Sequence, residues 1–221
     1  MKKMEIAYKV GDGLYINLTN KCSSACTFCL RQGDDKVGES DCLWLEREPT
    51  VEEATAAIEE KLKSYDYKEI VFCGFGEPTC VLETMLSVAK WVKQNTAIRT
   101  RLNTNGQADL INSKDVAPLL VGLIDTVSIS LNVPDAERYQ ALVRSRFGVQ
   151  SYDAMIAFAK RCVEEGLDVV MTTVETTISK EDEEKSRQLC QSIGARYRIR
   201  EWVDDGKEIF SHIKSKSHNT F

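Results

Sequence analysis

Three cysteines within eight residues place the strongest constraint on what this chain can fold into. Three residues separate Cys22 from Cys26, and two separate Cys26 from Cys29. Thiolates are the soft ligands that hold iron–sulfur clusters, and a regular helix would spread this trio over roughly 10 Å. We therefore expect a loop, at residues 20–42, wrapped around a compact cluster. Three thiolates would leave one iron of a four-iron cluster without a protein ligand, and an open position of that kind makes chemistry possible.

A zinc site is the main alternative for this loop. Structural zinc normally takes four ligands arranged as two close pairs. The other five cysteines are scattered along the chain and form no second close pair; they are Cys42, Cys73, Cys80, Cys162 and Cys190. The grouping therefore favours an iron–sulfur cluster over zinc.

The cysteine spacing, with Phe28 directly before the last cysteine, resembles the signature of the radical S-adenosylmethionine (SAM) superfamily. In that superfamily three cysteines hold a [4Fe-4S] cluster, and the amino and carboxylate groups of SAM's methionine end chelate the open iron. The resemblance implies that Cys22, Cys26 and Cys29 are metal ligands and that the cofactors are a [4Fe-4S] cluster and SAM.

Composition sets limits for the rest of the chain. With 43% hydrophobic residues, a chain of 221 residues can bury a sizeable core, so we expect one domain over residues 1–221 with a polar tail from about residue 204. A net charge of −5 does not indicate the strongly basic surface that nucleic-acid-binding proteins usually have. We find no run of about 18 apolar residues that would span a membrane, and Lys2 and Lys3 precede no signal-peptide-like apolar run. Eight cysteines then predict free thiols or ligands and a cytoplasmic location, because the cytosol is reducing.

Strand and helix patterns alternate along the chain. Runs of β-formers predict six strands, at residues 14–19, 69–73, 98–102, 127–132, 168–175 and 196–200. Helical spacing, with caps at Thr50 and Ser179, predicts helices at about 50–64, 81–92, 109–121, 152–165 and 179–193. Such alternation implies a parallel sheet with right-handed crossovers. Since each unit takes roughly 30 residues, we expect an α/β fold that forms a partial (β/α)6 barrel of the TIM type, with parallel strands and an open side.

A glycine-rich turn with a carboxylate follows the second predicted strand. Glycine permits close backbone approach to a ligand, and barrel enzymes collect active residues at strand ends; an ordinary strand-to-helix turn is the alternative. The residues after Gly74 resemble the superfamily's Gly-Gly-Glu-Pro motif, which holds SAM's amino group, with Phe75 in place of the first glycine. The resemblance implies that Gly74, Phe75, Gly76 and Glu77 bind SAM.

Two further strand ends carry polar candidates. Asn103 precedes a Thr-Asn-Gly turn signal that recurs at this place in relatives, which implies site roles for Asn103 and Asn105. Alternation along the fourth strand places Ser128, Ser130 and Asn132 on one face. Relatives bind SAM's ribose hydroxyls with polar side chains at this strand end, so Ser130 and Asn132 are the ribose candidates, although an acidic residue is commoner there.

The last strand alternates strictly, with three arginines on one face. Arg196, Arg198 and Arg200 are interpreted as decoration of an exposed edge. If they line the barrel mouth instead, they suit an anionic group, because arginine binds carboxylate or phosphate with two parallel hydrogen bonds. Glu175 ends the preceding strand and is interpreted as a solvated carboxylate, with substrate contact as the alternative.

One further segment narrows the resemblance. Residues 43–50, together with the cysteine spacing and the Gly74 motif, are similar to the TatD-family-associated radical SAM proteins, a group whose substrate is not established. The implied activity is one-electron reduction of the cluster by a donor such as flavodoxin or ferredoxin, then cleavage of SAM to a 5′-deoxyadenosyl radical that abstracts hydrogen from a small-molecule or nucleotide substrate. The 7-carboxy-7-deazaguanine synthases are comparably short relatives. A glycyl-radical activating enzyme and a non-catalytic iron–sulfur or zinc module stay open as alternatives.

Overall fold

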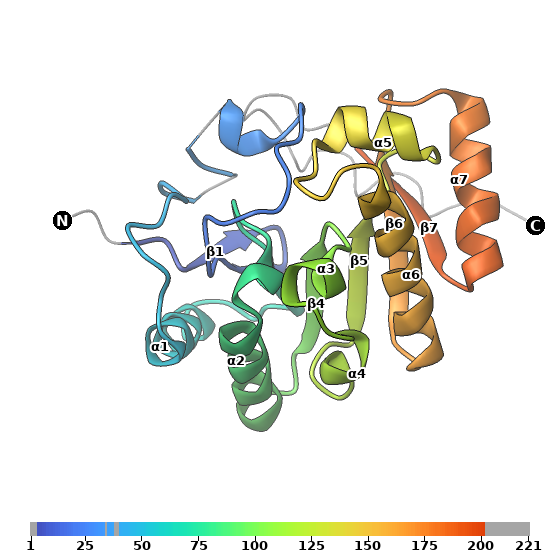
Figure 1. The fold of residues 1–221 in the computed structure, drawn as a ribbon. Helices are drawn as coiled ribbons and strands as arrows, with labels where there is room; N and C mark the ends of the chain where they lie inside the picture. The colour runs from blue at the N-terminus through green and yellow to red at the C-terminus, as the bar shows by residue number, and fades with distance from the viewer. Residues whose placement is uncertain (1–3, 34, 38–39, 202–221) are drawn as a thin grey trace, which may run out of the picture.

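Seven strands form one sheet in the described part of the computed structural model, which covers residues 4–33, 35–37 and 40–201 (Figure 1). The strands lie side by side in chain order: β1 (Ala7–Val10), β2 (Gly13–Ile16), β3 (Glu69–Phe72), β4 (Arg99–Thr104), β5 (Thr126–Ser130), β6 (Asp168–Val174) and β7 (Arg196–Arg200). β1 runs antiparallel to β2, and every later pair of neighbours is parallel. The predicted tail from about residue 204, and Lys2 and Lys3, lie outside the described residues.

The six predicted parallel strands are confirmed as β2 to β7, each within a few residues of its expected bounds. The antiparallel β1 was not predicted. It turns into β2 at Gly11, whose φ of 58° lies in the left-handed region that glycine adopts at little cost. Two strands of four residues each around a short turn give a weak sequence signal. β1 covers the edge that β2 would otherwise expose.

Helices and short turns connect the strands. The described helices are α1 (Val51–Leu62), α2 (Leu82–Asn95), α3 (Ala108–Asn112), α4 (Ala117–Leu120), α5 (Ala136–Val143), α6 (Gln150–Glu164) and α7 (Lys180–Ile193), with 3-10 turns at η1 (Leu30–Gln32) and η2 (Pro78–Val81). The predicted caps are confirmed, because the side chains of Thr50 and Ser179 accept hydrogen bonds from the first turns of α1 and α7. No helix within the described ranges is long and apolar enough to cross a membrane.

Two helix predictions need correction. The single helix expected over residues 109–121 is two short ones, α3 and α4, because Ser113 ends α3 with a φ of 52° and Pro118 occupies the first turn of α4. The sequence pattern between β5 and α6 did not predict α5, which begins at Ala136 and is capped by Asp135, whose side chain accepts a hydrogen bond from the Arg138 amide. Few residues of α5 are buried, so it lacks a strong apolar stripe.

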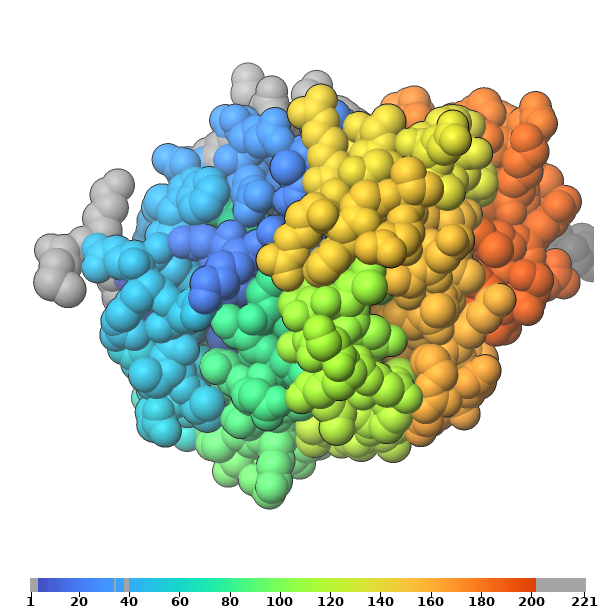
Figure 2. Space-filling model, in the orientation of Figure 1, coloured from blue at the N-terminus to red at the C-terminus, as the bar shows by residue number. Residues whose placement is uncertain are grey.

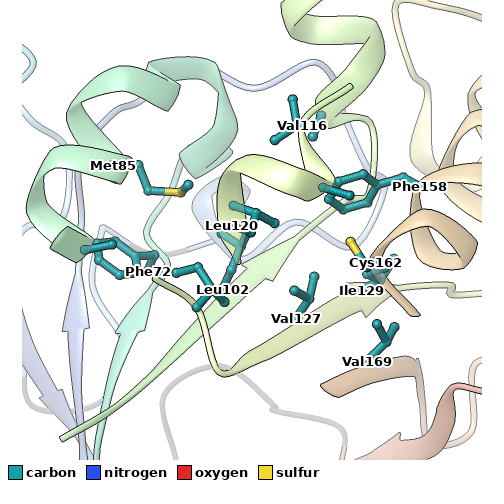
Figure 3. Packing of buried hydrophobic residues seen from close by; sticks show 14 of the residues in the cluster. Phe72, Met85, Leu102, Val116, Leu120, Val127, Ile129, Phe158, Cys162 and Val169 are labelled. Atoms are coloured by element: carbon teal, nitrogen blue, oxygen red, sulfur yellow. The ribbon is translucent and has the colours of Figure 1, made fainter. Parts of the chain in front are cut away.

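The helix-covered face of the sheet holds the core. Strand residues that alternate toward this face, such as Phe72, Leu102 and Ile129, pack against Met85 of α2 and Phe158 of α6 (Figure 3). Burying each such side chain stabilises the fold by about 1.5–3 kcal/mol. Two of the scattered cysteines, Cys162 and Cys190, are fully buried in this core. The space-filling view shows this side of the sheet covered by α2, α4 and α6 (Figure 2).

The opposite face of the sheet is polar and concave. It carries Arg101, Asn103, Ser128, Ser130, Arg198 and Arg200. A pocket of about 380 Å³ on this face takes lining residues from five strands, β3 to β7. Five flat strands would span about 20 Å, so the sheet must curl to share one pocket. The end strands β1 and β7 do not pair with each other, and the predicted partial, open barrel is therefore confirmed.

Candidate functional site

The cysteine loop begins where β2 ends and gathers its three thiols. All three cysteines are half-buried and free. Burial, with the neighbouring thiols of Cys22 and Cys29, raises the pKa of Cys26 to about 12. Three thiols near enough to act on one another in this way are a donor set that takes up metal by releasing protons.

The arrangement of these thiols differs from a single-ion cage. In the described parts of the chain, no three Cys, His, Asp or Glu side chains surround one ion-sized position. Structural zinc needs such a tetrahedral arrangement, whereas an iron–sulfur cluster takes each thiolate on a different iron. Three free thiols on one loop are a donor set of the kind that holds a cluster.

A segment far along the chain holds the cysteine loop in place. The amides of Ala25 and Thr27 donate to the carbonyls of Val143 (3.1 Å) and Leu142 (3.0 Å), at the end of α5. The Arg146 amide donates back to the carbonyl of Ser23 at 2.9 Å. These backbone bonds fix the loop on both sides of Cys26, which reduces the ordering that a ligand would otherwise have to impose.

Gln107 links the loop to the rest of the site. Its Oε1 accepts hydrogen bonds from Ser23 Oγ and Ser145 Oγ, both at 2.8 Å. Its Nε2 donates to Ser24 Oγ and Tyr139 Oη, both at 3.3 Å. Gln107 is fully buried, so each of these bonds satisfies a polar group that would otherwise be costly.

The sequence analysis missed this group of five residues around Gln107. The available signals were the two serines between the cysteines and a polar residue directly after the Asn-Gly turn. Neither signal predicts which residues are hydrogen-bonded to Gln107, because those residues come from segments that are far apart in the chain.

The two glycines of the Gly74 motif pack against the start of the cysteine loop. A Cβ on Gly76 would lie 2.2 Å from the Thr19 carbonyl oxygen and 2.6 Å from that of Lys21. A Cβ on Gly74 would lie 2.1 Å from Asn17 Oδ1. No side chain fits at these distances, so the glycines bring the turn after β3 against the chain that leads to Cys22.

Phe75 has a packing role that its motif position did not predict. Its ring is buried beside Trp44 at a centroid distance of 5.1 Å. With Tyr8 and Leu43 it forms a small second core. Only the backbone of Phe75 is therefore available to a ligand in the way that the motif implies.

Glu77 is a buried carboxylate with four internal hydrogen bonds. Oε1 accepts from Thr79 N (3.1 Å), Thr79 Oγ1 (2.8 Å) and Thr104 Oγ1 (2.8 Å), and Oε2 accepts from Asn105 N (2.8 Å). Burial raises the pKa of Glu77, while these bonds act in the opposite direction. A carboxylate oxygen has about two acceptor positions, so Oε2 keeps one for a ligand. A cationic amino group is the partner that such a buried carboxylate favours.

The side chains of Asn103 and Asn105 differ in their availability. Asn105 Nδ2 donates to Ser23 Oγ at 2.9 Å and lies 3.9 Å from Cys22 Sγ, while its Oδ1 accepts from the Gln107 amide. Asn105 is thus engaged with the cysteine loop. Asn103 Oδ1 is buried without a partner among the described residues, which leaves it free to accept from a ligand.

The two ribose candidates are not related as the alternation predicted. β5 ends at Ser130, and Asn132 follows in a left-handed conformation with a φ of 63°. Its Nδ2 donates to the Ser130 carbonyl at 3.2 Å, and its Oδ1 is buried without a partner in the described chain. The strand alternation therefore ends at Ser130 and does not extend to Asn132. Orphaned buried acceptors are rare, and Asn103 and Asn132 supply two that suit hydroxyl donors.

Cys80 lies closer to the cysteine trio than its sequence position indicated. Burial, Glu77 and Cys22 together raise the pKa of Cys80 to about 12. The five remaining cysteines are scattered in sequence, but this one approaches the loop in space because η2 follows the Gly74 motif directly.

Comparisons with known proteins agree with this geometry. The family model described as Radical SAM superfamily matches residues 16–192. A probable GTP 3',8-cyclase of Saccharolobus islandicus is 26% identical over 185 residues, which is 83% of this chain and 54% of that protein. This chain thus spans about half the length of that relative.

Solved structures with the same fold include two with bound cofactor. Streptococcus suis SuiB bound to S-adenosylmethionine matches with a TM-score of 0.64 and 21% identity, over 86% of this chain and 40% of that one. Native anSMEcpe with bound AdoMet matches with a TM-score of 0.60 and 17% identity, over 89% of this chain and 54% of that one. Since the family model covers most of the chain, including the cysteine loop and the Gly74 motif, this chain belongs to the radical SAM superfamily.

Proposed function

We propose that this chain is a radical SAM enzyme that holds one [4Fe-4S] cluster on Cys22, Cys26 and Cys29 and binds SAM beside it. The observation that carries the proposal is the connection between the three gathered thiols and the buried carboxylate of Glu77. Asn105 makes this connection, since its amide donates to Glu77 and its side chain reaches Ser23 and Cys22. The chemistry that cluster and SAM supply together is reductive cleavage of SAM to methionine and a 5′-deoxyadenosyl radical, which abstracts hydrogen from the substrate.

The residues of this chain bind and orient the cofactor in this proposal. The free acceptor position of Glu77 Oε2 takes the methionine amino group, alongside the backbone of Gly74, Phe75 and Gly76. The orphaned acceptors of Asn103 and Asn132 take ribose hydroxyls, next to Ser130. Asn105 acts mainly by positioning the cysteine loop.

The proposal also covers the finer assignments. Residues 43–50 support a place among the TatD-family-associated proteins, and they pack against the cluster loop, where Asn20 Nδ2 donates to the Leu45 carbonyl at 2.7 Å. The donor of the electron would be a flavodoxin or ferredoxin. The free cysteines fit a reducing, cytoplasmic setting. A nucleotide is one candidate substrate class, since the similar protein of S. islandicus is named a probable GTP 3',8-cyclase.

Anaerobic reconstitution with iron and sulfide tests this function. We expect about four irons per chain, an electron paramagnetic resonance signal that changes when SAM is added, and release of 5′-deoxyadenosine after reduction with dithionite. Cys26→Ala should remove the release, while Cys190→Ala, which removes a thiol from the core, should keep it. Stoichiometric zinc without iron uptake, or a reduced, SAM-bound protein that releases no 5′-deoxyadenosine with or without candidate substrates, would contradict the proposal.

A further inference from the structure

The pocket on the concave face carries more positive than negative side chains. Its charged lining residues are Lys68, Glu69, Arg99, Arg101, Asp168, Arg196 and Arg198. Two ion pairs account for both carboxylates: Arg101 pairs with Glu69 at 2.7 Å, and Arg196 pairs with Asp168 at 2.6 Å. Arg198 has no carboxylate left to pair with on this face of the described chain.

The side chains of Arg198 and of Arg200, two residues further along β7, make no hydrogen bond or ion pair with any residue in the described ranges. The Nε atom of Arg200 is buried without a partner in these ranges, although its backbone carbonyl accepts a hydrogen bond from the Glu175 amide at 2.7 Å. A buried donor on a charged group destabilises the fold when it is left unpaired, and a ligand that accepts from it removes that cost. The expectation that these arginines decorate an exposed edge is confirmed for Arg196, which is exposed and bound to Asp168; Arg198 is exposed as well but lines the pocket, and Arg200 is half-buried.

The surroundings of the two guanidinium groups favour a negatively charged ligand. Partial enclosure and the nearby Arg101 lower the pKa of Arg198, while Tyr15 and Glu69 act in the opposite direction. Burial also lowers the pKa of Arg200, and Arg198 acts in the same direction. Cations that crowd one another in this way are stabilised by an anion between them. The buried, unpaired Nε of Arg101 offers a further donor on the same face.

The register places the two arginines beside the proposed SAM residues. Arg198 is paired in register with Thr172, and Thr172 with Ser130. Arg200 lies near the thiol of Cys73, the residue before Gly74. The pocket itself is lined by the first residues of β3 to β7, and Arg198 lies on its wall. Arg200, two residues further along β7, lies toward the carboxyl ends of the strands, where Cys73 leads into the Gly74 motif.

We propose that Arg198 and Arg200 bind an anionic group of the substrate, a carboxylate or a phosphate, on the concave face of the sheet. This inference rests on the proposed function and names the substrate class of the same site. Arginine forms two parallel hydrogen bonds with either group, so two adjacent guanidiniums fix both the position and the orientation of the substrate. The neutral remainder of the substrate then extends toward Asn103 and the Gly74 motif.

Equilibrium binding to the reconstituted holoprotein tests this inference, with one matched pair of probes for each anion. For phosphate, GTP is compared with guanosine, which lacks the charged phosphates. For carboxylate, succinate is compared with succinamide, which is uncharged. We expect at least one anion to bind at least tenfold more tightly than its neutral partner. Arg200→Gln and Arg198→Gln should each lower that affinity at least tenfold. Arg187→Gln on the helix-covered side, where Arg187 stacks on Tyr197, should leave it unchanged.

Two results would overturn the inference. One is that neither anion binds better than its neutral partner, and the other is that both arginine variants keep the affinity of the original protein. Iron content and 5′-deoxyadenosine release, measured on the same unsubstituted preparation, report on the proposed function separately. A preparation that cleaves SAM but ignores both anions contradicts only the anion site, and one that binds an anion without cleaving SAM contradicts only the enzyme function.

Discussion

Glu77 combines a ligand role with a structural one. Its four hydrogen bonds join the turn after β3 to the end of β4, through Thr79, Thr104 and Asn105. Removing the side chain would leave several buried donors unsatisfied, at about 1–3 kcal/mol each. A loss of SAM binding in Glu77→Ala would therefore mix two effects, and a variant that keeps the side chain's shape separates them better.

Glu77→Gln is the change that isolates the charge. The amide keeps one acceptor oxygen but loses the negative charge that an amino group favours, and charge-assisted bonds contribute about 1.5–3 kcal/mol. We expect SAM affinity to fall by about tenfold to a hundredfold, with iron content retained, as measured by equilibrium dialysis and iron analysis. Glu83→Gln, at an exposed position on α2, is the control. Equal SAM affinity in Glu77→Gln and the parent protein would remove Glu77 from the binding site.

At the scale of elements, α5 connects the cysteine loop to the far end of the sheet. Carbonyls at the end of α5 accept hydrogen bonds from amides of the loop, and Arg138 of α5 makes a bidentate pair with Asp182 of α7 at 3.1 and 2.8 Å. The hydrogen bonds from Arg138 hold the pKa of Asp182 below its ordinary value. This pair therefore makes the attachment of α5 sensitive to acid.

The pH dependence of this pair has a definite sign. Because the folded pKa of Asp182 is below its unfolded value of about 3.9, the pair stabilises the fold above that pH and stops doing so as pH falls through the folded pKa. Arg138 is half-exposed, so we expect Asp182→Asn to lower the free energy of unfolding by about 0.5–1 kcal/mol at pH 7. Urea unfolding of the chain before reconstitution should show the difference shrinking as pH falls from 5 to 3. Glu181→Gln, next to it and exposed, is the control, and a difference that grows in acid would contradict the assignment.

At the scale of the whole molecule, local patterns predicted the sheet but not the meeting of its parts. The two-residue repeat of a strand and the 3.6-residue repeat of a helix can be recognised within a short stretch of sequence, so β2 to β7 and four helices were predictable. Alternation shows that Arg198 and Arg200 share a face, but it does not show that the sheet curls and encloses that face. Gln107 and Cys80 were missed for the same reason, since their neighbours in the site come from loops that are distant in sequence.

The contact between the Gly74 motif and the cysteine loop is where these distant parts meet most closely. Gly76→Ala would place a Cβ 2.2 and 2.6 Å from two backbone oxygens, and backbone cannot move aside as a flexible side chain does. The turn after β3 must then separate from residues 19–21, which lead into Cys22. Overpacking of this kind costs about 1–3 kcal/mol. We expect it to displace the loop that holds the three thiols, because residues 19–21 lead directly into that loop.

We therefore expect Gly76→Ala to lower the free energy of unfolding by about 1–3 kcal/mol and to reduce iron uptake to less than about half, while the circular dichroism of the sheet and helices stays close to that of the parent protein. Gly122→Ala is the matched control, because its Cβ would meet nothing within 4 Å and only its φ of 74° is strained. The control should lose stability without losing iron. Full iron uptake in Gly76→Ala would mean that the cysteine loop forms independently of the motif, and the site would then have to assemble on the cluster itself instead of on contacts already made by the fold.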